Sequence, residues 1–509
     1  MTDIVVFDDS VVVVGSPGWW LHRLCGKLAL DQPRLALMDR YYRGDHPLPY
    51  APPVLKDEFR TMLARSQSNF MRIVVQAPAE RLRVQGFRPK GTEDADAELW
   101  DWWTDFCEMD VDANLSISDS MAMGRSYLSI WQFQGDEQPQ VQVEDPRTTI
   151  TERDQRNRHR RAAGLRLWLD DWTGKVRADV WLPEACFHYV ATAQGQLATS
   201  TLWPQSWSPA YPINDTEVRY TDLVLREDPA ASALQWLSQW TEVGFTPNPS
   251  GEIPLVPLIN YPSVLKQPDG ESELDDVYLT QDRINETLFM RALAGWTTAY
   301  RQKWATGLDI PVVDGKPVQP FEAAIHRLWV SEDENTRFGE FGQTDLKPYI
   351  ESVEQDVQHL AVQTRTPRHY FLQQGQSPSG DAIKSAEAGL VAKVMEKQLY
   401  LGRAFSEVVR LRDVLSKREP RRVEVIWADP EFRTLAELTD ATIKQFAAGL
   451  IPRRVAQEKL QYSPSEIDRM VGLFAGEELV ADAVQAIEQP DETAVQEEAA
   501  EELQVPVGA

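Results

Sequence analysis

Residues 346–379 contain the most informative pattern for the fold: LKPYIESVEQDVQHLAVQ is followed directly by TRTPRHYFLQQGQSPS. The apolar residues of the first part recur at three- and four-residue spacings, which predicts an amphipathic helix over 346–363. They are Ile350, Val353, Val357 and Leu360. The second part, 364–379, is polar and irregular. It ends in Ser377-Pro378-Ser379, a helix-start signal because proline suits the first helical turn.

A second amphipathic stretch precedes this one, over 273–303. Its apolar residues recur at four- and seven-residue steps and are Val277, Ile284, Leu288, Ala292 and Ala299. The proline-rich stretch 247–270 before it marks a boundary. Between the two helical stretches, the insert 304–345 predicts two hairpins. One turns at Asp314-Gly315, and the other joins 328–330 to 337–341 around a polar tip at 332–335.

The C-terminal third is predicted to be mostly helical. A helix is expected from about residue 380 to Lys417, followed by a strand in RVEVIW (422–427). Thr434–Glu437 and Ser463–Glu466 are capping boxes, each of which predicts the start of a further helix. The final residues, 488–509, are acidic and rich in alanine, and disorder is expected there.

The N-terminal half, from about residue 20 to 265, reads as mixed helix and strand. Helices are predicted over 98–109 and 114–124. Strands are predicted over 126–133, 141–143, 165–169, 177–182 and 187–190. Trp168, Trp172 and Trp181 are expected to pack on a sheet face. The basic run 153–161 is either a solvated hairpin tip or a contact for an acidic protein or DNA. Together these patterns predict an α+β protein.

Composition excludes several classes of protein. With 42% hydrophobic and 26% charged residues, the 509-residue chain is neither fibrous nor mainly disordered. Its net charge of −26 argues against tight DNA binding by the whole chain, although DNA could still slide past it. The three cysteines lie far apart without a CxxC motif, so neither a disulfide framework nor a zinc ribbon is expected. No signal peptide and no run of about 18 apolar residues is present, so no membrane span is expected.

Motifs for enzyme chemistry are missing from the sequence. There is no GxxxxGK[ST] phosphate loop and no HExxH, and Gly124-Arg125-Ser126-Tyr127-Leu128 lacks the second glycine of a nucleophile elbow. We therefore expect no enzyme activity, no catalytic residue, no metal and no cofactor. The rival hypothesis is an intracellular hydrolase, which rests on the 17 tryptophans and the many carboxylates.

The order of these segments resembles that of the portal proteins of tailed bacteriophages, the head-to-tail connectors of siphophages and actinobacteriophages. The resemblance covers about residues 30–485. Its most specific part is Thr366–Phe371 followed by Ser377–Ile383, similar to the family's tunnel loop and the start of its long helix. Further similar segments are Asn114–Leu128 of the wing, Pro254–Pro257 with Asn260 on the approach to the stem, and Val425–Pro430 before the crown.

The resemblance implies a division of the chain into parts. Residues 1–265 would form the α+β wing, together with the long helix and strand of 380–432. The stem would comprise 266–303 and 346–363, with the clip at 304–345 between them. The tunnel loop would be 364–379, the helical crown 433–487 and the disordered tail 488–509.

The resemblance also implies a function. About twelve copies would form a ring at one capsid vertex, through which double-stranded DNA passes non-specifically during packaging and ejection. Implied partners are the terminase large subunit, a head-completion adaptor, the major capsid protein and scaffold protein, with no membrane. The protein would be assembled in the host cytoplasm and reside in the virion. Another head or neck protein of the virion is the alternative.

Two groups of residues are the candidate sites. The tunnel-loop group, expected to touch passing phosphates weakly, is Arg365, Arg368, His369, Gln373, Gln374, Gln376 and Ser377. An alternative is that its two arginines pair with carboxylates on a neighbouring subunit. The clip group, expected to dock partners, is Trp329, Glu332, Asp333, Glu334, Asn335 and Arg337.

Overall fold

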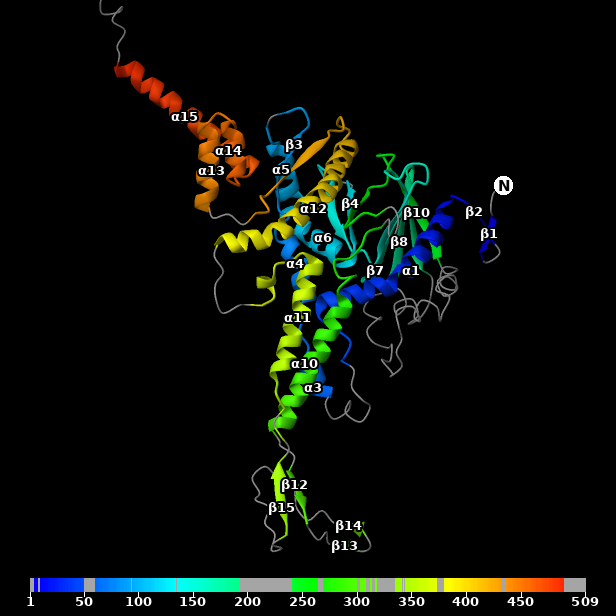
Figure 1. Ribbon diagram of the computed structural model, residues 1–509. Coiled ribbons are helices and arrows are strands. Elements are labelled where there is room, and N and C mark those ends of the chain that lie inside the picture. Colours follow the sequence, from blue (N-terminus) through cyan, green and yellow to red (C-terminus); the bar gives the residue numbers. More distant parts are fainter. Residues whose placement is uncertain are drawn as a thin grey trace, which may run out of the picture. The chain divides into compact units, whose positions relative to one another are not determined.

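Figure 1 shows the computed structural model of the chain. It describes residues 4–7, 10–49, 60–92, 94–133, 135–191, 240–263, 269–299, 303–307, 312–313, 316–317, 335–340, 342, 344–372, 380–431 and 435–488. The chain forms two compact units, each assembled from separate stretches of sequence. Unit 1 comprises Met1–Glu80, Ser116–Tyr127 and Glu144–Tyr400, and unit 2 comprises Arg81–Leu115, Leu128–Val143 and Leu401–Ala509.

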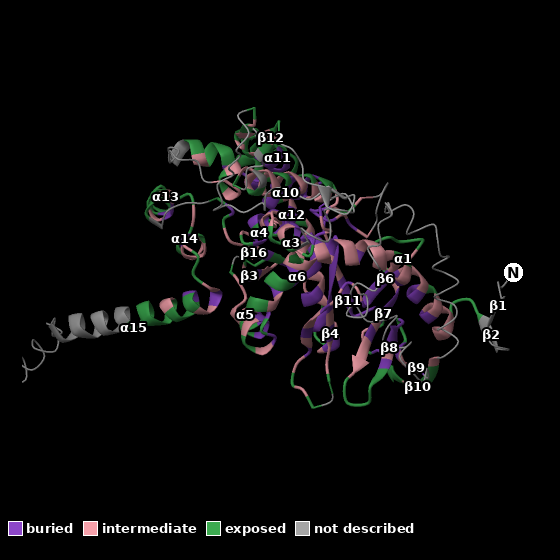
Figure 2. Cartoon of the chain, turned by 90° about the horizontal axis from the view of Figure 1, so that it is seen from below, coloured by how far each residue is buried: buried purple, intermediate pink, exposed green. Residues whose placement is uncertain are grey.

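Unit 1 contains an antiparallel five-stranded sheet in the order β10-β9-β8-β7-β6. Its strands are β6 (Thr149–Arg153), β7 (Arg161–Asp170), β8 (Lys175–Trp181), β9 (Ala185–Ala191) and β10 (Trp240–Pro247). The predicted strands over 165–169, 177–182 and 187–190 are therefore confirmed. Figure 2 shows that β8 is largely buried and that β7 mixes buried and partly exposed residues, whereas the turn between them is exposed.

A long helix, α1 (Pro17–Arg43), covers this sheet. Ser16 caps it by accepting the N–H of Trp19 at 3.3 Å, and Pro17 occupies the first turn, where its missing N–H costs nothing. Leu21, Leu24 and Leu28 of α1 pack on residues of the sheet, including Ile150, Leu165 and Val180. The sequence analysis did not predict this helix, which contains Pro33 in its interior.

Two expectations about hairpin tips have different outcomes. The basic run lies at the exposed turn between β6 and β7, so its interpretation as a hairpin tip is confirmed. The prediction for Trp172 is wrong, because this side chain is 98% exposed in the turn between β7 and β8. There, Asp170 Oδ1 accepts the N–H groups of Trp172 and Thr173 at 3.1 and 3.2 Å, and the tight turn holds Trp172 away from the sheet face.

Two further helices of unit 1 are α10 (Tyr278–Ala299) and α11 (Lys347–Thr364), which confirms helices within both predicted stretches. Between them, β12 (Lys303–Thr306) pairs with β15 (Arg337–Glu340), and β13 (Val312–Val313) pairs with β14 (Lys316–Pro317). The hairpin predicted around Asp314-Gly315 is thus present. The expected partner of 337–341, residues 328–330, lies outside the described residues, and β15 instead pairs with β12.

The remaining elements of unit 1, and those that continue into unit 2, are shorter or join the main layers. They are β1 (Ile4–Phe7), β2 (Ser10–Val13), α3 (Arg60–Arg65), α4 (Met71–Ala79), α6 (Met109–Met123), β4 (Arg125–Trp131), β5 (Gln140–Glu144), β11 (Leu255–Ile259), the 3₁₀ turn η2 (Arg368–Tyr370) and α12 (Gly380–Leu415). None of the helices in the described residues is both long and apolar enough to cross a membrane.

Unit 2 is built around an aromatic cluster. Its strands β3 (Val84–Pro89) and β16 (Val423–Trp427) pair antiparallel. Ring centroids of Trp103 lie 5.0 Å from Phe87 and 5.4 Å from Phe405. The predicted helix 98–109 proves to be α5 (Ala97–Asp101) followed by the π-helical turn η1 (Trp102–Phe106). The helices α13 (Leu435–Ala447), α14 (Arg453–Lys459) and α15 (Pro464–Glu488) complete the unit.

The second capping box is confirmed in atomic detail. The N–H of Ser463 donates to Glu466 Oε2 at 2.8 Å, and the N–H of Glu466 donates to Ser463 Oγ at 3.3 Å. Pro464 occupies the first position of α15. This reciprocal pair satisfies backbone donors that a helix start otherwise leaves open.

A glycine contact in unit 1 gives a first test of the fold. Gly270 has φ +97°, and a Cβ there would collide with the backbone oxygens of Gly124 and Asn260. We expect Gly270→Ala to lower the free energy of unfolding by about 3–5 kcal/mol, through left-handed strain and overpacking together. Gly174→Ala is the matched control, since it has φ +64° with open space around it and should cost only about 1–2 kcal/mol. Equal losses in urea denaturation would contradict the close contact.

Candidate functional site: the segment after α11 and its buried anchor

Helices α10 and α11 form an antiparallel pair, because β12 and β15 join the end of one to the start of the other. Both helices contribute buried apolar residues, namely Ile284 and Leu288 of α10 and Val353, Val357 and Leu360 of α11. Phe289 of α10 packs on Leu63 of α3. An ion pair joins α10 and α11: Arg283 Nη2 lies 2.8 Å from Asp356 Oδ1, and the Asp356 side chain is 11% exposed. We call the pair α10–α11 the stalk. It determines where the chain continues at residue 365.

The chain leaves α11 through Arg365, which has the left-handed conformation at φ 54°. Its N–H bonds to the carbonyls of Ala361 and Val362, and the N–H of Thr366 donates to Ala361 at 3.0 Å. These bonds satisfy carbonyls at the helix end, as a C-terminal glycine usually does. The left-handed conformation destabilises an arginine by about 1–2 kcal/mol. The hydrogen bonds at the helix end offset this strain and fix the direction in which the chain leaves α11.

The structure brings together three residues of the predicted tunnel-loop group, namely Arg365, Arg368 and His369. Arg368 Nη2 lies 3.7 Å from Glu354 Oε2, and His369 Nε2 lies 3.5 Å from Glu387 Oε1. Arg368 thus has a carboxylate partner within its own chain. Both pairs are partly exposed, so each stabilises the fold by only about 0–1 kcal/mol.

The other predicted site residues divide between exposed positions and positions outside the described residues. Asn335 and Arg337 are exposed, and Arg337 begins β15 opposite Thr306 of β12. The structure does not describe Gln373, Gln374, Gln376, Ser377, Trp329, Glu332, Asp333 and Glu334.

A fully buried charge cluster anchors the whole region. Glu273, just before α10, receives Lys393 Nζ of α12 at 2.5 Å and also pairs with Lys397. The three side chains are 3%, 1% and 2% exposed, respectively. Lys393 also donates to the carbonyl of Thr364 at 2.8 Å, and Lys397 donates to Asn260 Oδ1. We call Glu273, Lys393, Lys397 and Asn260 the stem anchor.

The stem anchor connects the start of α10, the end of α11 and the middle of α12. Its charges do not cancel, because one carboxylate faces two ammonium groups. Burial alone would raise the pKa of Glu273, but Lys397 and Lys393 outweigh it and lower the pKa to about 2. Burial also lowers the pKa of Lys397 to about 8, against the opposing attraction of Glu273. The Lys397 ammonium lies 3.8 Å from the ring centroid of Tyr261, a contact that stabilises the second cation.

Sequence reasoning missed the charged members of the stem anchor, although a signal was present. Lys393 and Lys397 lie four residues apart on the same stripe of α12 as the buried residues Leu390 and Leu401. Two lysines on an apolar stripe indicate either a buried partner or an interface. Glu273 carried no comparable signal, since acidic residues surround it in the sequence.

Comparison with known proteins shows the family of the chain. Residues 21–470 match the family described as "Phage portal protein, SPP1 Gp6-like". A match of this extent defines the class of protein as a phage structural component. The chain belongs to the phage portal protein family, and the resemblance drawn from its sequence is confirmed.

Individual relatives carry the same designation. The "Portal protein" of Mycobacterium phage D29 is 27% identical over 432 residues, which cover 79% of this chain and 77% of that protein. The "Portal protein" of Mycobacterium phage L5 is 26% identical over 431 residues, with the same coverage. A solved structure, "Virion of native gene transfer agent (GTA) particle", aligns over 85% of this chain with 11% identity and a TM-score of 0.33, which is too low to support an argument.

Removing the carboxylate of the stem anchor should be more damaging than removing one of its cations. Glu273→Gln leaves two buried ammonium groups without a counter-charge, so we expect a loss of about 3–5 kcal/mol in the free energy of unfolding. Lys397→Met leaves the Glu273–Lys393 pair balanced and should cost about 1–2 kcal/mol. Asp276→Asn changes an exposed carboxylate nearby and should cost less than about 0.5 kcal/mol. If urea denaturation showed equal losses of unfolding free energy for Lys397→Met and Glu273→Gln, the explanation by one carboxylate facing two ammonium groups would be contradicted.

The lowered pKa of Lys397 also predicts a pH dependence. The folded protein releases this proton near pH 8, whereas the unfolded chain keeps it until about 10.5, so stability from this group rises with pH between those values. The stability advantage of wild type over Lys397→Met should therefore grow by about 2 kcal/mol from pH 7.5 to 9.5. Urea denaturation of both proteins at the two pH values measures it. A constant or shrinking difference would show that Lys397 stays protonated.

Proposed function

We propose that copies of this chain form a closed ring of about twelve at one capsid vertex, through which double-stranded DNA is packaged and later ejected. The observation that carries the proposal is the exposed apolar surface of the α10–α11 pair. In the described part of the chain, α10 and α11 pack on each other and α3 packs on α10 through Leu63, which leaves much of both long helices in contact with water. Large apolar side chains on that outer surface need a further partner.

The exposed apolar residues occur on both helices of the stalk. Val362 is 72% exposed and Leu279 is 65% exposed. Met290, Trp296 and Ile350 are each between 43% and 44% exposed. A second copy of the same stalk is the simplest partner, because copies related by rotation about one axis cover such surfaces repeatedly and close into a ring.

Polar and acidic residues of α11 suit a channel through which DNA slides. Its exposed positions include Glu351, Glu354, Gln355 and Gln358. Carboxylates repel phosphates, so passing DNA meets no deep binding minimum. In this proposal the segment 364–379 is the tunnel loop. Arg365, Arg368 and His369 at its base, together with Gln373, Gln374, Gln376 and Ser377, make weak contacts with phosphate.

The parts of the chain take the roles that the family plan gives them. The wing is 1–265 with 380–432, the stem is 266–303 and 346–363, and the crown is 433–487. The clip, 304–345, contains exposed β-strand edges suited to pairing with another chain and docks the terminase large subunit and the head-completion adaptor. The terminase supplies the packaging motor, the wing and crown meet the major capsid protein and scaffold protein, and assembly occurs in the host cytoplasm.

The family is structural and not enzymatic, and the chain is a component of the virion. A hydrolase therefore loses its support, since it rested only on tryptophan and carboxylate content. A different head or neck protein is the remaining alternative. End-on electron micrographs of the purified protein separate it from a portal, which has a central hole.

Ring formation through the stalk is tested at Val362. Light scattering after size exclusion should give a mass of about twelve chains of 57.9 kDa each for wild type. Val362→Glu should shift the protein to smaller species, because assembly would bury an unpaired carboxylate. Val362→Thr keeps the shape without a charge and should still form rings. If Val362→Glu still formed a full ring, the surface around Val362 would not be part of the interface between subunits.

A further inference from the structure

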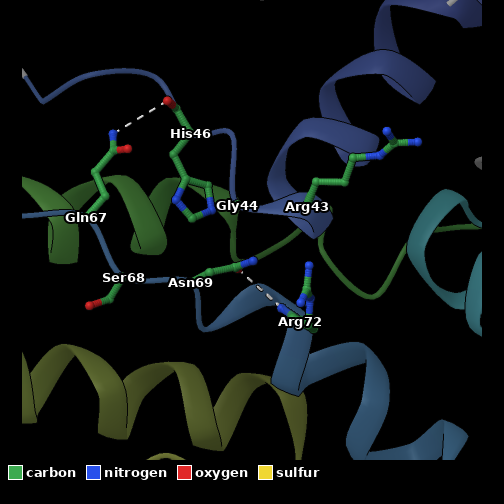
Figure 3. Close-up of a pocket in the computed structure, with 7 residues that line it drawn as sticks. All are labelled: Arg43, Gly44, His46, Gln67, Ser68, Asn69 and Arg72. Atoms are coloured by element: carbon green, nitrogen blue, oxygen red, sulfur yellow. Dashed lines mark hydrogen bonds between the residues drawn. The ribbon is translucent and has the colours of Figure 1, made fainter. Parts of the chain in front are cut away.

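A pocket of about 290 Å³ in unit 1 lies between the end of α1 and the start of α4 (Figure 3). Two arginines, Arg43 and Arg72, line it, and no carboxylate does. In a chain with a net charge of −26, a wall with this composition is unusual. Its volume is at the lower end of the range for ligand sites, which suits a small ion or one group of a larger molecule.

His46 places a hydrogen-bond donor without a partner in the wall of this pocket. The residue is only 4% exposed. Asn285 Oδ1 accepts the N–H of Ser68 at 3.0 Å and Gln281 Nε2 at 3.1 Å, which fixes the orientation of the Asn285 amide. Asn285 Nδ2 must then donate to His46 Nδ1, at 3.1 Å. In the neutral imidazole the hydrogen therefore lies on Nε2.

His46 Nε2 has no hydrogen-bond partner of good geometry in the described part of the chain, although the backbone of Tyr41 interacts with the ring. Burial is the main cause of a lowered pKa of His46, against smaller opposing effects of Tyr41 and Asp45, so the neutral form prevails near pH 7. A buried N–H donor without an acceptor is unfavourable, and nearly all such groups in folded proteins find one. Figure 3 shows the His46 ring between Gly44 and Gln67. An acceptor arriving in the pocket would satisfy it.

The two arginines differ in whether a carboxylate already pairs with the guanidinium. Arg43 Nε donates to Asp39 Oδ1 at 2.7 Å, which neutralises part of its charge. Asp119 also attracts Arg43, and Asp45 pairs with Arg40 at 3.3 Å. Within the described residues no carboxylate pairs with Arg72, whose guanidinium lies 6.0 Å from the ring centroid of Tyr42. Arg72 is therefore the main free positive charge at the pocket.

The backbone at the start of α4 is closed to a ligand. Asn69 Oδ1 already accepts the N–H groups of Met71 and Arg72 at 3.1 and 3.3 Å. A Cβ on Gly44 would lie 2.9 Å from Asn69 Nδ2, so the glycine allows the close approach of these two walls. Any ligand must consequently be held by side chains, with the fork of Arg72 and His46 Nε2 as the candidates, because Figure 3 shows the Arg43 guanidinium and the Ser68 hydroxyl turned away from Arg72.

We propose that this pocket binds a phosphate group, with Arg72 as its principal charged partner and His46 Nε2 as a buried neutral donor. The planar guanidinium can donate two parallel hydrogen bonds to an oxyanion, and a neutral N–H donor can add a third. The phosphate comes either from solution as the free ion or from the backbone of DNA. The proposal concerns the single chain and does not depend on ring formation.

Isothermal titration of the full-length protein with sodium phosphate tests the proposal, with sodium chloride at matched ionic strength as the reference. We expect saturable phosphate binding, weakened about tenfold or more by Arg72→Gln, which removes one charge-assisted pair from an exposed residue. Arg156→Gln is the matched control, since it removes an exposed arginine from the β6–β7 turn and should leave binding unchanged. Arg72→Lys keeps the charge without the fork and should bind at an intermediate level.

Competition with a short DNA duplex identifies the source of the phosphate. Displacement of bound phosphate by the duplex in wild type, and weaker duplex binding by Arg72→Gln, assigns the pocket to the DNA backbone. Binding of free phosphate without displacement assigns it to the ion. Absence of saturable binding, or equal losses in Arg72→Gln and Arg156→Gln, overturns the proposal and leaves the assignment as a portal untouched.

Discussion

The stem anchor is the interaction on which the rest of unit 1 depends. Glu273, Lys393 and Lys397 are each no more than 3% exposed, and their hydrogen bonds reach the start of α10, the end of α11 and the middle of α12. Apolar packing alone would allow these helices to slide, because it has no preferred direction. A charged cluster in a dry interior allows one arrangement only, since any other leaves an ion unpaired. The position of the segment after α11 follows from this constraint.

Positive charge in this acidic chain is concentrated at a few places with different uses. In the stem anchor it is buried and fixes helices. At Arg365 and Arg368 it is exposed or partly exposed, and Arg368 lies beside Glu354. At the pocket beside α4, Arg72 has no carboxylate partner within the described residues. Because the chain is acidic overall, exposed positive charges such as these arginines and the basic run 153–161 are the points that attract phosphate.

The sequence predicted the helical stem, the strands of the sheet and the family, because each leaves a periodic or ordered pattern. It could not predict α1, whose interior Pro33 argues locally against a helix and whose formation depends on packing against the sheet. The prediction for Trp172 was wrong because a tryptophan is usually buried, whereas here the turn formed by Asp170 holds the side chain in solvent. The stem anchor was missed because Glu273 and Lys397 are 124 residues apart, and no local pattern links them. Predictions for Gln373–Ser377 and the clip residues 329–334 remain predictions.

Burial of the stem anchor has a further consequence for a protein that works beside densely packed DNA. Mobile ions accompany DNA in large numbers, and they screen charges that face the solvent over distances of about 10 Å or less. This screening weakens the partly exposed pairs of Arg368 and His369. The cluster around Glu273 does not, because ions cannot enter it. In the proposed function, packaging and ejection of DNA would therefore change the ionic surroundings of Arg368 and His369, while the buried cluster that holds the helices would stay the same.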